Sequence, residues 1–255
     1  MKIPENLGKL ITDVKVPAEG IEVLMELIEL EQKMKQDFFL LGGGRIQGAI
    51  FDLDGVLVDT AKYHYLAWRR LARELGFDFS EHDNERLKGV SRMRSLEILL
   101  EIGNYTMSDA EKFEATARKN DWYVGYLRTL DENALLPGSR EFLKCLKTGG
   151  VKIALGSASK NAPLILERLG VTGLFDAVID GNAVSKAKPD PEVFLKGAEA
   201  LGLSPDLCVV FEDALAGIEA ARAGGMRVIA IGKPELLPGA DRYVSSLQDM
   251  LLTYR

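Results

Sequence analysis

The feature that most constrains this chain is the ten-residue stretch at residues 51–60, which reads FDLDGVLVDT. An apolar run precedes Asp52, one residue separates Asp52 from Asp54, and Gly55 follows with a backbone free to turn at positive φ. This pattern predicts a strand that ends in a turn lined by carboxylates. Residues two apart on a strand point to the same side, so we expect both acids at one site beyond the strand's carboxyl end.

An ordinary acidic turn is the alternative interpretation, because Asp and Gly are common turn residues. Two features favour a functional site. Asp52 and Asp54 lie among apolar neighbours, where uncompensated charge is costly, and Asp59 and Thr60 add a third acid and a hydroxyl after a second apolar run.

Composition excludes several classes of function. The chain has 255 residues and a formal net charge of -6, and no Lys/Arg block resembles a stripe for a phosphate backbone, so a nucleic-acid partner is not expected. Cys145 and Cys208 are the two cysteines and form no CxxC pair, which argues against a disulfide framework or a zinc site. No signal-peptide pattern and no apolar run of membrane-spanning length is present. We therefore expect a cytoplasmic globular enzyme with no membrane partner.

The apolar spacing becomes helical after Thr60. One helix is predicted over 61–75, a second is capped by Ser91 and ends near Gly103, and a third opens with the capping box at 108–111 and runs to about Leu130. Because nothing between residues 61 and 134 reads as a strand, this segment is predicted to be an all-helical cap domain. It would be inserted into a core domain made of residues 47–60 and 135–255.

Strands and helices alternate from residue 135 onward, which predicts βαβ units, hence an α/β fold with a doubly wound, mostly parallel sheet and helices on both faces. Strands are expected at 151–156, 177–179, 207–211 and 227–231, and helices at 139–148, 161–169, 191–201, 214–223 and 247–252.

Residues 1–46 precede the first strand of such a fold. Apolar residues recur at roughly helical spacing over 21–30, and three glycines follow at 42–44, so we expect an amphipathic helix and a flexible linker. The apolar stripe could pack on the main domain, pair with another chain or end a neighbouring domain. Packing on the main domain is the simpler interpretation.

Three further stretches fall where predicted strands end, and a doubly wound sheet gathers its site there. Residues 156–161 combine small hydroxyl residues with free backbone amides at the start of a helix. This pattern is typical of a phosphate-binding loop and equally of a simple helix cap. Lys188 is followed by the rigid stretch Pro189-Asp190-Pro191 and could neutralise phosphoryl charge, although lone lysines are usually solvated. Glu212 and Asp213 end a buried strand, where a hard divalent ion such as Mg²⁺ would relieve their repulsion. Asp213 could also cap the next helix.

Together with Asp52 and Asp54, these segments resemble all four motif positions of the haloacid-dehalogenase superfamily. Within that superfamily, residues 60–68, 87–92, 118–121 and 157–161 are similar to the β-phosphoglucomutase family, and the similarity spans about residues 47–255. The resemblance implies a Mg²⁺-dependent phosphomutase that interconverts β-D-glucose 1-phosphate and glucose 6-phosphate through a bound β-glucose 1,6-bisphosphate.

The same resemblance assigns roles to individual residues. Asp52 would be the nucleophile that forms an aspartyl-phosphate, and Asp54 the general acid and base. The metal would be held by the Asp52 carboxylate, the Asp54 backbone carbonyl, Glu212 and Asp213. The substrate and its two phosphates would be bound by Thr60, His64, Trp68, Gly89, Val90, Arg92, Ser95, Lys119, Ser157, Ala158, Ser159, Lys160, Asn161 and Lys188.

Within that set, His64 and Lys119 would couple closure of the cap to the reacting site. From the residues alone, His64 is expected to be a packed helix residue and Trp68 a core residue. Their assignment to substrate binding therefore depends on the resemblance.

Two other functions are compatible with the sequence. A phosphatase of the same fold would act on a small phosphosugar or a phosphoglycolate-like ester, with water in place of a sugar hydroxyl as attacking group. A non-enzymatic module with residues 18–40 as a docking helix is disfavoured for residues 47–255 by the presence of both Asp52 and Asp54. We expect residues 47–255 to be monomeric, with a small sugar phosphate as substrate and the extension as a candidate protein contact.

Overall fold

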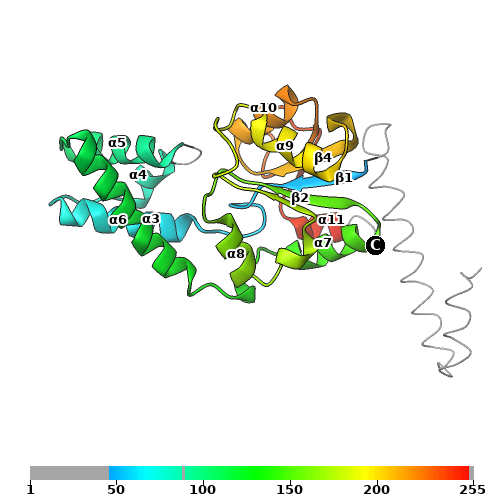
Figure 1. Cartoon of the computed structure of the whole chain (residues 1–255), viewed down its shortest axis with the longest axis horizontal. Helices are drawn as coiled ribbons and strands as arrows, with labels where there is room; N and C mark the ends of the chain where they lie inside the picture. Colours follow the sequence, from blue (N-terminus) through cyan, green and yellow to red (C-terminus); the bar gives the residue numbers. More distant parts are fainter. Residues whose placement is uncertain (1–45, 88–89, 253–255) are drawn as a thin grey trace, which may run out of the picture.

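The computed structural model describes residues 46–87 and 90–252. The helix and linker predicted before residue 46 lie outside the described residues, as does Gly89. Figure 1 shows two bodies side by side, one built only of helices and the other of a sheet covered by helices on both faces. Among the described residues, no helix is both long and apolar enough to cross a membrane.

The sheet has six parallel strands in the order β3-β2-β1-β4-β5-β6. The strands are β1 (Gly48–Phe51), β2 (Lys152–Gly156), β3 (Ala177–Ile179), β4 (Cys208–Glu212), β5 (Arg227–Ile231) and β6 (Arg242–Val244). This is the doubly wound parallel arrangement predicted from the alternating pattern, in which the strand order reverses between β1 and β4. Ligand sites of such sheets lie at the carboxyl ends of the strands beside that reversal.

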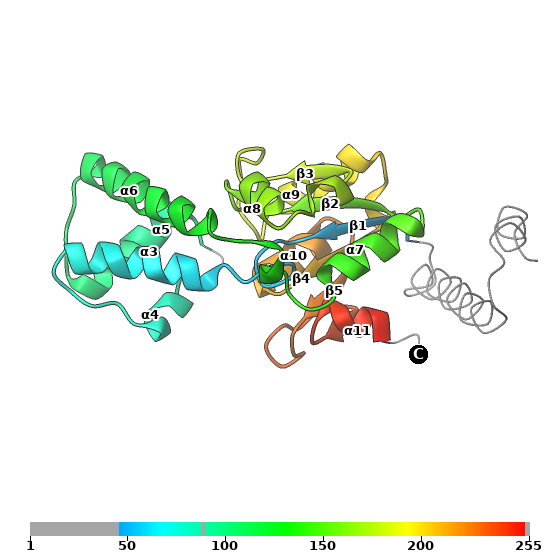
Figure 2. The same ribbon diagram turned by 90° about the horizontal axis from the view of Figure 1, so that it is seen from below.

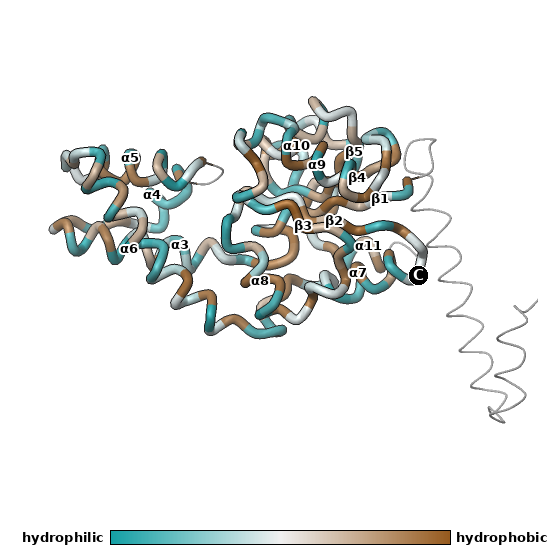
Figure 3. Tube along the Cα trace, viewed as in Figure 1, coloured by the Kyte–Doolittle hydropathy of each residue, from teal (hydrophilic) through white to brown (hydrophobic). Residues whose placement is uncertain are grey.

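Two apolar cores form because successive side chains of a strand point to opposite faces of the sheet. From β1, Ala49 and Phe51 enter one core, and Ile50 enters the other. The first face is covered by α7 (Ser139–Thr148), α8 (Ala162–Arg168) and α11 (Leu247–Leu252), and the second by α9 (Glu192–Leu201) and α10 (Leu215–Ala223) (Figure 1). Figure 3 shows the apolar strands enclosed between these layers.

The helical body contains α3 (Ala61–Glu74), α4 (Glu81–Glu85), α5 (Arg92–Gly103) and α6 (Asp109–Leu127), and Figure 2 shows α3 and α6 lying side by side. Ser80, Ser91 and Ser108 each accept a hydrogen bond from a backbone amide of the helix that they cap. The apolar sides of these helices enclose a separate core that includes Trp68, Leu71, Leu96 and Leu99. Short 3-10 turns lie outside this body, at Glu132–Ala134, Thr172–Leu174 and Pro205–Leu207.

The two connections between the bodies lie next to each other. The Leu136 amide donates to the Leu57 carbonyl over 2.9 Å, and Val58 forms an isolated antiparallel bridge with Leu135. The chain therefore leaves the sheet body after β1 and returns to it at nearly the same point, which is suited to a hinge.

Three aromatic rings join β1, β4 and α7 beneath the carboxyl edge of the sheet. Phe51 stacks on Phe211 at 4.5 Å between ring centroids, and Phe142 meets both rings edge-on at 6.2 and 5.4 Å. Because Asp52 and Glu212 directly follow two of these rings, packing here supports the acids of the site.

Replacing Phe142 by Ala should lower the free energy of unfolding by about 3–5 kcal/mol, since its ring is buried and the cavity left behind cannot collapse fully. The control is Phe113→Ala, because Phe113 is 67% exposed and should change stability by less than about 0.5 kcal/mol. Urea titration followed by circular dichroism measures both. Equal effects of the two substitutions would show that the aromatic packing does not stabilise the sheet body.

Candidate active site

The carboxyl ends of β1 and β4 place Asp52 beside Glu212. Phe51 is in register with Phe211, and the Asp52 amide donates to the Phe211 carbonyl over 2.9 Å. Asp52 is 8% exposed and Glu212 is 1% exposed. Two buried carboxylates next to each other repel, and both lose hydration, so this arrangement needs positive charge close by.

Lys188 supplies part of that charge. Its Nζ lies 2.5 Å from Asp52 Oδ1 and 2.8 Å from Glu212 Oε2, although these residues are far apart in the sequence. Burial alone would lower the pKa of Lys188, but Asp52 and Glu212 outweigh it and raise that pKa above its usual value. Lys188 therefore stays charged and bridges the two acids.

Asp213 completes a cluster of acids at this edge. One carboxylate oxygen from each of Asp52, Glu212 and Asp213 lies within 4.8 Å of the others. Burial, followed by the charges of Asp52 and Glu212, raises the pKa of Asp213 to about 8. Three acids against Lys188 leave an excess of negative charge, and an all-oxygen donor set fits a divalent cation. Asp54 contributes no side-chain atom to the cluster, so its carbonyl remains a predicted ligand.

Asp54 is linked to the helical body by a chain of hydroxyl groups. Thr60 Oγ1 donates to Asp54 Oδ1, and the Tyr123 hydroxyl of α6 donates to Thr60 Oγ1 over 3.2 Å. Burial raises the pKa of Asp54 to about 7, with further increases from Asp52 and Asp59, while the Thr60 hydrogen bond lowers it. A group with this pKa can both donate and accept a proton near neutral pH.

Three cationic or basic groups from three helices meet near Tyr123 in the helical body. Lys119 Nζ of α6 lies 3.0 Å from His64 Nδ1 of α3. Arg92 of α5 interacts electrostatically with both side chains. Burial and repulsion by Arg92 lower the pKa of Lys119 to about 7, and burial with Lys119 and Arg92 lowers that of His64. Within the described residues Arg92 makes no ion pair, and burial lowers the pKa of Arg92. An anion beside these groups would favour their charged forms and relieve their mutual repulsion, so the group is suited to binding one.

The predicted phosphate loop after β2 reaches the helical body through Asn161. The Ser157 amide donates to the Ile179 carbonyl over 3.0 Å, and the Ser159 amide donates to Ser157 Oγ over 3.1 Å. Asn161 Nδ2 donates to Asn120 Oδ1 of α6 over 3.2 Å. Ala158 and Lys160 are exposed on the same loop.

The remaining predicted contacts differ in accessibility. Trp68 is 2% exposed, and Lys119 Nζ lies 4.5 Å from the centroid of its ring, so Trp68 packs in the helical core beneath the cationic group. Ser95 is 5% exposed, whereas Val90 is 40% exposed. Their roles toward a substrate stay predictions.

Tyr123 and Asn120 were not singled out individually in the sequence. Tyr123 follows Lys119 by four positions on a predicted helix, so helical spacing places it on the same face, and this signal could have found it. Asn120 faces Asn161 only through the packing of the two bodies, which the sequence does not show.

A buried carboxylate bridged to a lysine, an acid with a pKa of about 7 and a separate cationic group are suited to moving phosphoryl groups between oxygen atoms. We therefore place this chain among enzymes of that class, and comparison with known proteins agrees.

A family model described as haloacid dehalogenase-like hydrolase matches residues 46–225, and the chain belongs to this family. A β-phosphoglucomutase of Bacillus subtilis is 43% identical over 81% of this chain and 92% of its own length. A phosphorylated carbohydrates phosphatase of Thermotoga maritima is 35% identical over 72% of this chain and 84% of its own. The crystal structure of a β-phosphoglucomutase from Clostridium difficile superposes with a TM-score of 0.75 at 41% identity, over 82% of this chain and 98% of that one.

Replacing Gly55 by Ala should weaken binding of a divalent cation on the order of tenfold, because a Cβ at Gly55 would overlap Asp213 Oδ2 and displace that carboxylate. Gly76→Ala is the matched control, since Gly76 also has a positive φ but no neighbour that a Cβ would meet. Isothermal titration with Mg²⁺ measures both variants. Equal losses would attribute the effect to backbone strain alone.

Replacing Lys119 by Met should remove a pH dependence of stability. The pKa of Lys119 is about 7 in the fold against 10.5 ordinarily, so above neutral pH the unfolded chain binds one more proton. The free energy of unfolding of the wild type should therefore rise, relative to Lys119→Met, by on the order of 1 kcal/mol per pH unit between about pH 7 and 9. Urea unfolding across that range measures the difference. Parallel curves for the two proteins would show that Lys119 is not held neutral.

Proposed function

We propose that this chain is a Mg²⁺-dependent β-phosphoglucomutase, which interconverts β-D-glucose 1-phosphate and D-glucose 6-phosphate by way of an aspartyl-phosphate and β-glucose 1,6-bisphosphate. The observation that carries the proposal is the presence of two separate cationic groups. Lys188 lies at Asp52, and the cluster of Lys119, His64 and Arg92 lies beyond Asp54 in the helical body. A bisphosphate has two anionic ends, and a mutase must hold one while the other reacts.

In the proposed first step, the Asp52 carboxylate bonds to phosphorus as the bond from phosphorus to the sugar oxygen breaks. Asp54 gives its proton to that leaving oxygen, and in the return step the Asp54 carboxylate takes a proton from the attacking sugar hydroxyl. A pKa of about 7 allows both tasks. Lys188 would stabilise charge on the transferring group, and Ser157 and Ala158 would bind it.

Asp52, the Asp54 carbonyl, Glu212 and Asp213 would hold Mg²⁺. When bound, the cation would offset negative charge on the acids and the phosphoryl oxygens.

A phosphatase that acts on small phosphosugars is the second candidate, supported by the relative in Thermotoga maritima. The two activities differ in whether a sugar hydroxyl or water attacks the aspartyl-phosphate. Closure of a cap made of residues 61–134 over a core of residues 47–60 and 135–255 would exclude water. We further propose that the protein is a cytoplasmic monomer over residues 47–255, and that the extension at residues 1–46 is dispensable for turnover.

The direct test incubates the purified chain with Mg²⁺ and β-glucose 1-phosphate, with and without β-glucose 1,6-bisphosphate, and follows glucose 6-phosphate and free phosphate separately. A mutase forms glucose 6-phosphate, faster with the bisphosphate, and little free phosphate. Stoichiometric release of free phosphate without glucose 6-phosphate would favour the phosphatase.

Replacing Arg92 by Ala should lower formation of glucose 6-phosphate on the order of a hundredfold, about 3 kcal/mol, because a charge-assisted contact to the distal phosphate is lost. Phosphorylation of Asp52 by acetyl phosphate should persist. The control is Arg94→Ala on the same helix, since Arg94 is exposed and pairs with Glu97 and Glu101. Full mutase activity in Arg92→Ala, or loss of Asp52 phosphorylation with it, would contradict the two-phosphate interpretation.

A further inference from the structure

The loop that carries Lys188 packs on the apolar core through Val184, at its beginning. It joins β3 to α9, and residues 185–187, which lead into Lys188, are exposed. The Lys188 side chain must nevertheless point inward, because its Nζ bridges Asp52 and Glu212. Between Val184 and Lys188, hydrogen bonds are what hold the exposed part of the loop in the shape that aims Lys188 at the two acids.

Glu192, the first residue of α9, makes most of these hydrogen bonds. Its Oε2 accepts from the Ser185 amide over 2.9 Å, from Ser185 Oγ over 2.9 Å and from the Lys186 amide over 2.8 Å. The loop is also tied after Lys188, where Asp190 Oδ1 accepts from the Glu192 amide over 3.0 Å. Glu192 is thus bonded to the chain on both sides of Lys188.

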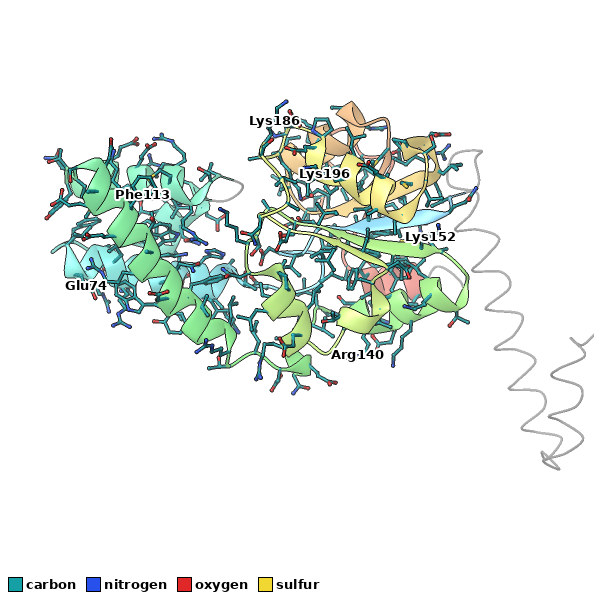
Figure 4. All side chains as sticks on the ribbon, viewed as in Figure 1. Glu74, Phe113, Arg140, Lys152, Lys186 and Lys196 are labelled. Atoms are coloured by element: carbon teal, nitrogen blue, oxygen red, sulfur yellow. The ribbon has the colours of Figure 1, made fainter. Side chains whose placement is uncertain are left out.

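Lys196 fixes the Glu192 carboxylate from the next turn of α9. Its Nζ donates to Glu192 Oε1 over 2.7 Å and to the Ala183 carbonyl over 2.6 Å. Figure 4 labels Lys186 and Lys196, which lie near each other on the α9 side of the sheet. The hydrogen bond from Lys196, with those from the loop, lowers the pKa of Glu192 to about 2, so this carboxylate remains an acceptor throughout the neutral range.

We propose that Glu192 is a positioning residue for phosphoryl transfer at Asp52, acting through the loop at residues 183–190 to hold Lys188 between Asp52 and Glu212. The proposal rests on the proposed attack by Asp52 but not on which sugar phosphate is the substrate. Because Glu192 itself touches neither Asp52 nor Glu212, its effect must pass through Lys188.

The test measures the rate at which acetyl phosphate phosphorylates Asp52 in the presence of Mg²⁺. Glu192→Ala should slow this step on the order of tenfold or more, since a small displacement of a group at the reacting centre is costly. Glu199→Ala is the matched control: Glu199 is exposed on the same helix, two turns further on, and should leave the rate within about twofold. Hydrogen exchange of the Ser185 and Lys186 amides should accelerate in Glu192→Ala and not in the control.

A double-mutant cycle separates positioning from a general loss of structure. In a Lys188→Ala background, the further change Glu192→Ala should alter the rate by less than about twofold, because the group that it positions is already absent. An equal slowing in both backgrounds, or a Glu192→Ala rate equal to that of Glu199→Ala, would overturn the proposal. If wild-type Asp52 is not phosphorylated at all, the proposed function and the positioning role of Glu192 both fail. If wild-type Asp52 is phosphorylated and Glu192→Ala matches it, only the positioning role fails.

Discussion

Three carboxylates gather at one edge of the sheet, two of them buried and the third half-buried, and their mutual repulsion sets what the surrounding chain must supply. Asp52, Glu212 and Asp213 lie together because β1 and β4 are adjacent at the point where the strand order reverses. Lys188 offsets part of their charge. A divalent cation would offset the remainder, and binding it would account for a costly arrangement at an otherwise apolar edge.

Two glycines show how closely the surrounding chain is fitted to these acids. A Cβ at Gly55 would overlap Asp213, and a Cβ at Gly217 in α10 would overlap the carboxylate of Glu212. Glu212 Oε1 also accepts from the amides of Asp213 and Ala214, so its orientation is set by the start of the following segment. The backbone therefore holds the acids where side-chain repulsion alone would separate them.

The helical body places a group of basic side chains near Asp54. Arg92 and Lys119 lie near His64, and the hydroxyl groups of Tyr123 and Thr60 connect this cationic group to Asp54. An anionic substrate that lies between the bodies would gain from both the cation at the sheet edge and this group. Because the two connections between the bodies lie next to each other, the helical body could move towards the sheet edge without disturbing the sheet.

Much of this architecture could be predicted from the sequence because it follows from local patterns. The apolar runs marked five strands, and capping residues such as Ser91 and Ser108 marked helix starts within one residue. The strand β6 and the helix α4 were not predicted: β6 has three residues, and α4 has five although Ser80 and Asp83 form a capping box.

Contacts between distant segments could not be predicted from residues alone. Lys188 meets an acid 136 positions away, and Tyr123 meets Thr60 across two helices, and neither pairing leaves a local pattern. For the same reason the hydrogen bonds between Glu192 and the loop at residues 183–190 could be identified only in the folded chain, although the sequence around Lys188 suggested a site.

In the proposed reaction Asp52, held beside Lys188, is the nucleophile whose carboxylate oxygen bonds to phosphorus. The most direct measurement traps the phosphorylated chain in acid after exposure to acetyl phosphate and Mg²⁺, reduces the acyl phosphate with borohydride, and locates the resulting homoserine by peptide mass spectrometry. We expect a single modified residue, Asp52, and no modification of Asp54. Modification at Asp54 or at another residue, with Asp52 unchanged, would contradict it.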